Sequence, residues 1–296
     1  MPIAVEFEYF RPKSLTEAVG LLSRYDGKAR VLAGGTDLLV WIKEGLQAPE
    51  ALVDLKGITG LGELQVKNNL LSIGALVTFT DLLESNDVRS KLPLLWEAAK
   101  ATASTGIRNR ATLVGNICSA VPSMDGAPPL LAYDALVAVF GPAGSREVSI
   151  HQWFTGPKRT CLRPGEVVTG ITVPVPAAGN GASYVRLGRY EGEDLAQVCV
   201  AVLAMANDTY RIAFGAVGPV PTRALKIEAV LKDKKLDENT IAKAKKLVAS
   251  EISPISDVRA TQEYRLHMAG VMLERGLRAA VKRLAGNGPR YGERLI

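Results

Sequence analysis

The chain has 296 residues, of which 47% are apolar and 22% are charged, and its formal net charge is +6. This length and composition are typical of a globular protein with two modest domains, each able to bury a core. No uninterrupted run of ~18 apolar residues exists, which excludes an ordinary membrane-spanning helix. Basic residues do not interleave with aromatic ones, so no nucleic-acid partner is expected, and the absence of a secretory signal predicts a cytoplasmic protein.

The cysteines and histidines are too few and too scattered for a metal site or a disulfide framework. Cys118, Cys161 and Cys199 lie far apart in the sequence, whereas an iron–sulfur cluster needs four nearby thiolates. His151 and His267 are the only histidines. We therefore expect three small buried thiols and no metal ligands in this chain.

The first elements suggest a β-α-β arrangement. A capping box at residues 14–17 precedes apolar residues with helical spacing over residues 15–22. Residues 29–33 and 52–55 are short apolar runs typical of strands, while residues 38–42 fit either a helix or a strand. No Gly-x-Gly-x-x-Gly motif follows the first strand, so a dinucleotide fold of the Rossmann type is disfavoured.

Two adjacent glycines, Gly34 and Gly35, follow the strand expected at residues 29–33. Glycine lets the backbone turn and lets main-chain N–H groups come close to a ligand. Successive N–H groups in such a turn form a concave site for a phosphate. A simple tight turn is the other interpretation, because short glycine motifs are frequent. Under the first interpretation, the missing side chain of Gly35 allows the main chain to approach the phosphate.

The central part of the chain mixes strands with short helices. Residues 64–73 have the pattern of a β-hairpin, and Thr78 or Thr80 is suited to cap a helix. A second helix around residues 94–99 is expected to end near residues 103–106. A further helix begins near residue 127, and strands are expected at residues 135–140, 148–150 and 167–173. The proline- and glycine-rich residues 174–181 are interpreted as a linker.

A second small-residue turn, at residues 112–117, lies about eighty residues after the first. Two such loops could hold one diphosphate from two sides. Arg108 and Arg110 come just before the second loop. Their guanidinium groups could offset the charge of a diphosphate or form exposed ion pairs.

The last third of the chain has strands first and helices later, which favours an α+β domain. Three antiparallel strands are expected at residues 183–187, 198–206 and 210–216, followed by helices at residues 224–231, 241–250 and 262–284. The residues from 286 onward have the composition of a flexible tail.

Together these motifs resemble the FAD-binding (medium) subunit of the xanthine dehydrogenase / carbon monoxide dehydrogenase family of molybdenum hydroxylases. The resemblance begins at residues 10–18, includes both loops and residues 160–166, and ends at residues 257–265. It implies an α+β fold, with a two-subdomain FAD-binding domain of the vanillyl-alcohol-oxidase-like type and a C-terminal α+β domain containing a three-stranded antiparallel sheet. The implied boundaries are residues 1–176 (subdomains of about 1–57 and 58–176), 177–285, and a tail at 286–296.

The resemblance also implies which residues contact FAD. In the family, an Ala-Gly-Gly-Thr-type loop and a Thr-Ile-Gly-Gly-Asn-type loop hold the FAD diphosphate. The matching residues of the first loop are Val31, Leu32, Ala33, Gly34, Gly35, Thr36, Asp37 and Leu38, and those of the second are Thr112, Val114, Gly115 and Asn116. Matches at the FAD or its flavin are Thr102, Ala103, Asp125, Val168, Arg186 and Leu195.

Several of these matches have a structural alternative. Asn116 and Asp125 are residue types that often stabilise turns, and Leu195 could be a buried strand residue. Val114 stands where the family usually has glycine, and Leu195 stands where some relatives have an aromatic residue. Because Val114 is β-branched, we expect a negative φ there and a cost of at most roughly 0.5–1 kcal/mol in backbone entropy for a change to glycine.

The function implied by the resemblance is electron transfer. Relatives oxidise a substrate at molybdopterin-bound molybdenum in a large subunit, and electrons pass through 2Fe–2S clusters of a small subunit to FAD and then to NAD, quinone or oxygen. The expected assembly is a dimer of heterotrimers. We expect no catalytic acid–base pair or nucleophile in this chain. Two alternatives remain, a stand-alone FAD oxidoreductase and a FAD-lacking assembly scaffold, the latter suggested by Val114.

Overall fold

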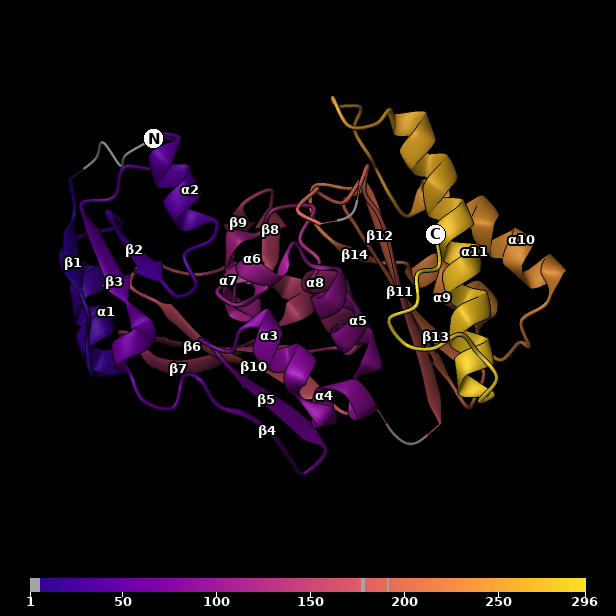
Figure 1. The fold of residues 1–296 in the computed structure, drawn as a ribbon, viewed down its shortest axis with the longest axis horizontal. Helices are drawn as coiled ribbons and strands as arrows, with labels where there is room; N and C mark the ends of the chain where they lie inside the picture. Colours follow the sequence, from indigo (N-terminus) through magenta and orange to yellow (C-terminus); the bar gives the residue numbers. More distant parts are fainter. Residues whose placement is uncertain (1–5, 177–178, 191) are drawn as a thin grey trace.

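The computed structural model describes residues 6–176, 179–190 and 192–296 (Figure 1). The three larger sheets follow one another across the molecule, a three-stranded sheet, a five-stranded sheet and a four-stranded sheet, with helices packed around them. We call residues 6–176 the N-terminal part and residues 179–296 the C-terminal part. No helix of the described ranges is both long enough and apolar enough to cross a bilayer.

The first sheet is parallel and has the order β1-β3-β2. Its strands are β1 (Glu8–Phe10), β2 (Ala29–Leu32) and β3 (Ala51–Asp54), and its helices are α1 (Leu15–Arg24), α2 (Leu38–Lys43) and the 3₁₀ turn η1 (Leu55–Gly57). Residues 38–42, which fitted either type of element, are therefore helical. Ser14 caps α1 as expected, but the Glu17 carboxylate accepts from the Lys13 N–H and not from that of Ser14.

The second sheet is antiparallel and has the order β4-β5-β10-β6-β7. Its strands are β4 (Leu64–Lys67), β5 (Leu70–Gly74), β6 (Leu136–Gly141), β7 (Gly144–Ser149) and β10 (Val167–Pro174). Asn68 and Asn69 both have positive φ, which is the type I′ geometry that matches the twist of a hairpin. A short hairpin of β8 (Phe154–Gly156) and β9 (Arg159–Thr160) follows the 3₁₀ turn η2 (Ile150–Gln152).

Short helices make up the rest of the N-terminal part. They are α3 (Phe79–Glu84), α4 (Asn86–Lys91), α5 (Pro93–Ala101), α6 (Thr105–Arg108), α7 (Leu113–Ser119) and α8 (Ala127–Ala132). Thr78 caps α3 with a complete capping box, in which Asp81 bonds back to the Thr78 N–H. The stretch expected as a second loop, at residues 112–117, is therefore the start of a helix, and Thr112 is its N-cap.

The C-terminal part contains a four-stranded antiparallel sheet with the order β11-β12-β13-β14. Its elements are β11 (Asn180–Leu187), β12 (Val198–Met205), β13 (Thr209–Gly215), β14 (Thr222–Arg223), α9 (Leu225–Leu231), α10 (Glu238–Leu247), the 3₁₀ turn η3 (Val248–Ser250) and α11 (Gln262–Leu284). The prediction of a three-stranded sheet was wrong, because β14 has only two residues and is too short for an alternating pattern.

Both faces of the C-terminal sheet are buried. On β12, Ala201 and Leu203 pack into the core of the N-terminal part, whereas Val200 and Val202 pack into a second core beneath α11. This alternation is the two-residue period of a strand. Because the first core is shared, the two parts are joined by apolar packing as well as by the chain, and their relative position is fixed.

The residues after α11 are docked, unlike the flexible tail expected from the sequence. Tyr291 lies 4.4 Å beneath the Arg283 guanidinium, and the Gly292 N–H donates to Glu97 on α5 at 2.8 Å. Lys100 also donates to the Gly292 carbonyl at 3.0 Å. The sequence could not reveal this docking, because its partners lie almost two hundred residues earlier. The domain boundaries inferred from the resemblance stay a prediction.

Candidate functional site

The loop between β2 and α2 is the first component of the site. Residues 31–39 are all half-buried, although the loop joins two regular elements. The main-chain N–H groups of Gly34, Gly35, Thr36 and Asp37 have no hydrogen-bond partner in the described ranges. Asp37 is the N-cap of α2 but makes no side-chain capping bond. Unpaired N–H groups at the start of a helix are suited to bind an anion.

The two glycines of this loop are required for different structural reasons. A Cβ on Gly34 would lie 2.0 Å from the carbonyl oxygen of Arg110, so only glycine allows the loop to touch the segment before α7. Gly35 has a φ of +79°, and a Cβ there would meet Leu32 and Leu39 side chains at 2.9 and 3.3 Å. Gly35 is therefore required by the turn itself, whereas Gly34 brings the two stretches together.

The N-terminus of α7 is the second component. The Thr112 hydroxyl accepts from the Gly115 N–H at 2.9 Å, so this N–H is already used for capping and is not free for a phosphate. The Val114 N–H has no partner in the described ranges. Val114 has ordinary helical geometry, as expected, but its side chain is only 4% exposed. A glycine at this position would therefore cost more than the backbone term that we expected.

Asn116 links α7 to the turn before α8. Its Oδ1 accepts from the Gly126 N–H at 3.0 Å, which is a structural role of the kind considered as the alternative. Because Asp125 immediately precedes Gly126, this bond fixes the position of the Asp125 turn relative to α7.

A small cavity lies where the two components meet. Thr78 and Thr112 form an isolated antiparallel β-bridge at this place. The cavity has a volume of about 80 Å³. It is lined by Ala33, Gly34, Lys56, Leu76, Thr78, Asn109, Arg110 and Thr112. Pockets for whole small molecules are typically ≈ 300–1,000 Å³, so this cavity is suited to a phosphate-sized group with the remaining ligand outside. The sequence did not indicate Lys56, Thr78 or Asn109 as lining residues.

A buried charge cluster contains Asp125 and Arg186, which lie 61 residues apart in the chain. The Asp125 carboxylate accepts from the Arg186 Nε at 2.9 Å and from the Tyr184 hydroxyl at 2.7 Å. Burial raises the pKa of the Asp125 carboxyl, and the Arg186 charge opposes this shift. Arg186 also donates to the carbonyl of Asp194, which positions the following residue, Leu195, at the surface with 43% exposure. Leu195 is thus not a buried strand residue.

Thr102 and Ala103 form the turn between α5 and α6. Arg108 donates to their two carbonyl oxygens at 2.7 and 2.8 Å, so it holds the backbone of this turn. Its role in offsetting the charge of a diphosphate stays a prediction. Ala103 has a φ of 41°, which is unusual for a residue with a side chain. The Ser104 hydroxyl donates to Glu193, which joins this turn to the loop that carries Leu195.

Hydrogen bonds and close approaches of the backbone connect most of the expected site residues into one continuous surface. It runs from the β2–α2 loop through Arg110 and α7 to Asp125 and Arg186, and then to Leu195 and the turn at Thr102. Val168 is not joined to this surface by any of these contacts, and its side chain packs in the core opposite Val139 of β6.

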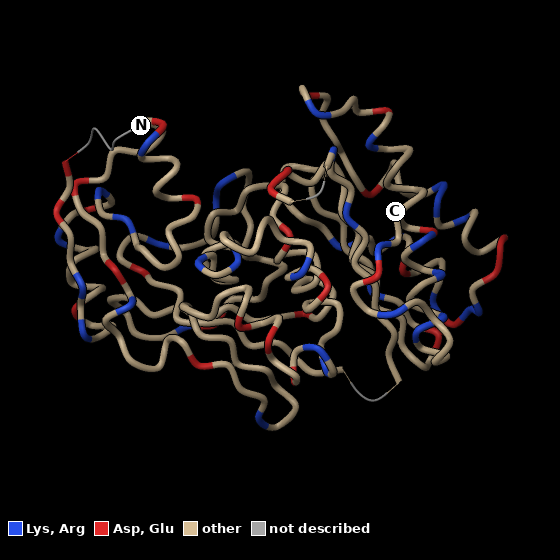
Figure 2. Tube along the Cα trace, in the orientation of Figure 1, with Lys and Arg blue, Asp and Glu red and all other residues tan. Residues whose placement is uncertain are grey.

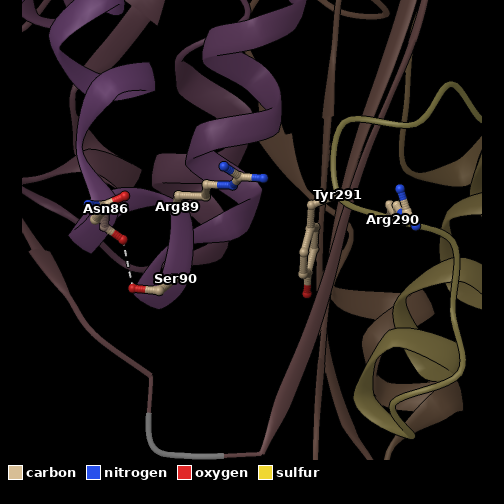
Figure 3. A pocket seen from close by; sticks show the side chains of 5 residues that line it. All are labelled: Asn86, Arg89, Ser90, Arg290 and Tyr291. Carbon is tan, nitrogen blue, oxygen red and sulfur yellow. Dashed lines mark hydrogen bonds between the residues drawn. The ribbon is translucent and has the colours of Figure 1, made fainter.

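A second, larger cavity of about 630 Å³ lies away from this surface. It is lined by Asn86, Arg89, Ser90, Arg290 and Tyr291. Figure 3 shows Arg89 on α4 pointing across the cavity toward the ring of Tyr291. None of the residues expected at FAD lines it.

The described residues contain no group of three or more His, Cys, Asp or Glu side chains that could hold a metal ion. The three cysteines are free thiols; Cys199 is buried, but Cys118 and Cys161 are half-buried, unlike the expectation for all three. Lys and Arg residues are interspersed with Asp and Glu along the described part of the trace (Figure 2).

Comparisons with known proteins agree with this arrangement. Residues 5–176 match the family described as the FAD binding domain in molybdopterin dehydrogenase, and residues 182–280 match the CO dehydrogenase flavoprotein C-terminal domain. The carbon monoxide dehydrogenase medium chain of Afipia carboxidovorans is 35% identical over 280 residues, which cover 94% of this chain and 97% of that one. The xanthine dehydrogenase FAD-binding subunit of Escherichia coli O157:H7 is 31% identical, with coverages of 94% and 97%.

The chain belongs to the FAD-binding medium-subunit family of the carbon monoxide dehydrogenase and xanthine dehydrogenase type. It is thus the FAD subunit of an oxidoreductase of the molybdenum hydroxylase class, and the resemblance found in the sequence is confirmed.

Solved structures support the same membership. The carbon monoxide dehydrogenase of Hydrogenophaga pseudoflava superposes with a TM-score of 0.92 at 36% identity, covering 96% of this chain and 99% of that one. Quinoline 2-oxidoreductase of Pseudomonas putida 86 gives a TM-score of 0.89 at 30% identity, with coverages of 97% and 99%. The α+β architecture of the medium chain therefore extends over almost the whole molecule. The vanillyl-alcohol-oxidase-like classification stays a prediction.

The residues present fit FAD as a ligand. Unpaired N–H groups in the β2–α2 loop suit an anionic diphosphate, and the cavity between the two components has room for a phosphate. At the other end of the surface, exposed Leu195 provides an apolar contact for a flat ring system.

Proposed function

We propose that this chain binds one FAD non-covalently and relays electrons from 2Fe–2S clusters of a small partner subunit to an acceptor such as NAD, quinone or oxygen. The observation that carries the proposal is the meeting of the β2–α2 loop with the N-terminus of α7. Two stretches almost eighty residues apart enclose a phosphate-sized cavity, and Gly34, which lines it, begins a run of four unpaired N–H groups.

The diphosphate would lie at this cavity. The N–H groups of Gly34, Gly35, Thr36 and Asp37 are its donors, because they are free and adjacent. On the other side, the cavity is lined by Thr112, the N-cap of α7. Val114 does not argue for a FAD-lacking scaffold, since its main chain has the same helical geometry that a glycine would adopt.

The flavin would lie toward Leu195 and the turn at Thr102 and Ala103. When bound, FAD supplies the exchange between one-electron and two-electron carriers. The chain positions it, because the Asp125–Arg186 pair fixes the loop that presents Leu195 and Arg108 fixes the opposite turn. A leucine in place of an aromatic residue removes ring stacking at this position, which leaves dispersion contact alone.

The partners follow from the same proposal. A small iron–sulfur subunit would deliver electrons, and a large subunit with the molybdopterin cofactor would carry the substrate site, in a dimer of heterotrimers. The names of the relatives support this assembly, since they are medium chains and FAD-binding subunits. A cytoplasmic location belongs to the same proposal.

The first experiment tests cofactor content. The purified chain should show flavin absorbance near one equivalent, and acid precipitation should release FAD into the supernatant, where mass spectrometry identifies it. Colour that stays with the denatured protein would contradict non-covalent binding, and a colourless folded chain that takes up no added FAD would remove the proposal.

The second experiment tests the relay. When the chain is expressed with its genomic neighbours and purified by a tag on this chain, an iron–sulfur chain and a molybdenum chain should accompany it. The metal-free chain alone should hydroxylate no substrate. Turnover by that metal-free chain would favour a stand-alone oxidoreductase.

A further inference from the structure

Lys56 lies on the wall of the cavity between the two components of the site and is not among the residues implied by the family resemblance. It belongs to the 3₁₀ turn η1, directly after β3. Its ammonium group donates to the Ala33 carbonyl at 2.9 Å and lies 2.7 Å from the Asp54 Oδ1. The first of these bonds holds the β2–α2 loop from outside the loop.

Asp54 holds both the side chain and the main chain of Lys56 in place. It is 2% exposed, and it accepts from the Tyr9 hydroxyl on β1 and from the Lys56 N–H at 2.9 Å. Burial alone would raise the pKa of the Asp54 carboxyl, but the hydrogen bonds from Lys56 and Tyr9 together outweigh burial and lower it. The carboxyl is therefore ionised at neutral pH and fixes the direction of the Lys56 side chain.

The two side chains of this ion pair differ in their exposure to solvent. The Asp54 side chain is 3% exposed, whereas that of Lys56 is 34% exposed and lines the cavity. A ligand in the cavity would therefore meet the ammonium and not the carboxylate. An ammonium group has three N–H donors, and two of them are used by Ala33 and Asp54. The third has no acceptor among the described residues, and Lys56 is one of the residues that line the cavity.

We propose that Lys56 binds the diphosphate of FAD, with its third N–H donating to a phosphate oxygen in the cavity between the β2–α2 loop and α7. This inference rests on the proposed binding of FAD. Lysine binds phosphate as a point charge, and here its stem is held in place before the ligand arrives. Lys56 thereby connects β1 and β3 of the first sheet to cofactor binding through Tyr9 and Asp54.

The test uses the purified full chain after FAD removal and measures dissociation constants for FAD and for ADP, a diphosphate without a flavin. Lys56→Gln removes the charge but keeps a side-chain donor for the Ala33 carbonyl, and Asp54 keeps its bonds to Tyr9 and to the main chain. A charged hydrogen bond contributes ≈ 1.5–3 kcal/mol, so both ligands should bind about 10- to 100-fold more weakly. Lys56→Arg should stay within a few-fold of the original chain.

Lys28→Gln is the matched control, because Lys28 forms an exposed pair with Glu50 and is not among the residues that line the cavity. It should bind FAD and ADP as the original chain does. Circular dichroism and the melting temperature confirm that each variant is folded. If Lys56→Gln does not fold, the comparison of Lys56→Arg with Lys56→Met replaces it.

The salt dependence separates direct binding from mere support of the loop. Added NaCl weakens attraction between charges, so the original chain should lose FAD affinity with salt more steeply than Lys56→Gln. Unchanged affinity in Lys56→Gln overturns the inference, and so does a weaker affinity with the original salt dependence. If the original chain binds no FAD, the proposed function fails, and that result is distinct from both of these.

Discussion

Replacing Glu97 with glutamine is expected to destabilise the contact between the N-terminal and C-terminal parts. Glu97 lies on α5, and its carboxylate accepts four hydrogen bonds from the C-terminal part. Two come from Arg283 on α11 at 2.9 and 3.0 Å, one from the Tyr184 N–H at 2.9 Å and one from the Gly292 N–H at 2.8 Å. The side chains of Glu97 and Arg283 are only 5% and 3% exposed.

The magnitude follows from this burial. Removing one partner of a buried ion pair costs about 3–5 kcal/mol, because the other charge stays out of water without compensation. Glutamine keeps the size of the side chain, but it leaves Arg283 without a counter-charge and turns an NH₂ group toward main-chain donors. For a chain of this size, ~2–4 °C of melting temperature corresponds to 1 kcal/mol, so we expect a decrease of roughly 6–20 °C.

The assay is thermal and urea unfolding of Glu97→Gln, Arg283→Met and the double variant. The double variant should lose less than the sum of the single losses, because both changes remove the same interaction. Glu50→Gln, at the exposed pair with Lys28, is the control and should melt as the original chain does. A loss of less than about 1 kcal/mol in Glu97→Gln would refute the argument from burial.

Three further predictions concern the site and the core. Val114→Gly should cost roughly 2–4 kcal/mol of unfolding free energy, since each of the three lost carbons contributes ~0.8 kcal/mol and glycine in a helix costs ~1 kcal/mol more. A loss below ~1 kcal/mol in urea unfolding would contradict this prediction. Gly34→Ala should lose FAD on gel filtration, because its Cβ would lie 2.0 Å from the Arg110 carbonyl oxygen. The control Gly20→Ala should keep FAD, because its Cβ would meet no atom within 4 Å. Equal retention of FAD by the two variants would contradict the reasoning. Burial raises the pKa of Cys199 to about 12, so its thiol stays protonated in the folded chain. Its contribution to stability is complete below about pH 9 and is lost as the pH rises toward 12. Iodoacetamide at pH 8.5 should therefore label Cys199 only after unfolding, as mass spectrometry can check.

Long periodic elements could be predicted from the sequence, and short ones could not. Helix α11 was predicted with the observed ends, because its apolar spacing is sustained over 23 residues and Thr261 caps its start. The two-residue strand β14 and the four-residue helix α6 carry no such pattern. Hairpin β4–β5 was predicted from its two asparagines, which adopt the positive φ that the turn requires.

The second component of the site was predicted as a loop because Gly115 and Asn116 are poor helix formers. The residue that could have corrected this is Thr112, whose hydroxyl caps α7. The expected FAD contacts at Asp125, Arg186 and Leu195 are brought together by hydrogen bonds between segments far apart in the chain. Only the resemblance could indicate them, because no local pattern records which distant segments meet, and their contacts with FAD stay predictions.

The position of Glu97 also has a consequence for the order in which the chain folds during synthesis. Its carboxylate is built into α5, but Arg283 and Gly292 follow 186 and 195 residues later. A ribosome adds ~5–20 residues per second, so the N-terminal part is complete for several seconds before these partners emerge. During that time α5 carries a carboxylate that must remain hydrated, and the face of α5 that meets β11 stays open. The N-terminal part can therefore form early, but it reaches its final packing only when the segment around Gly292 has been made.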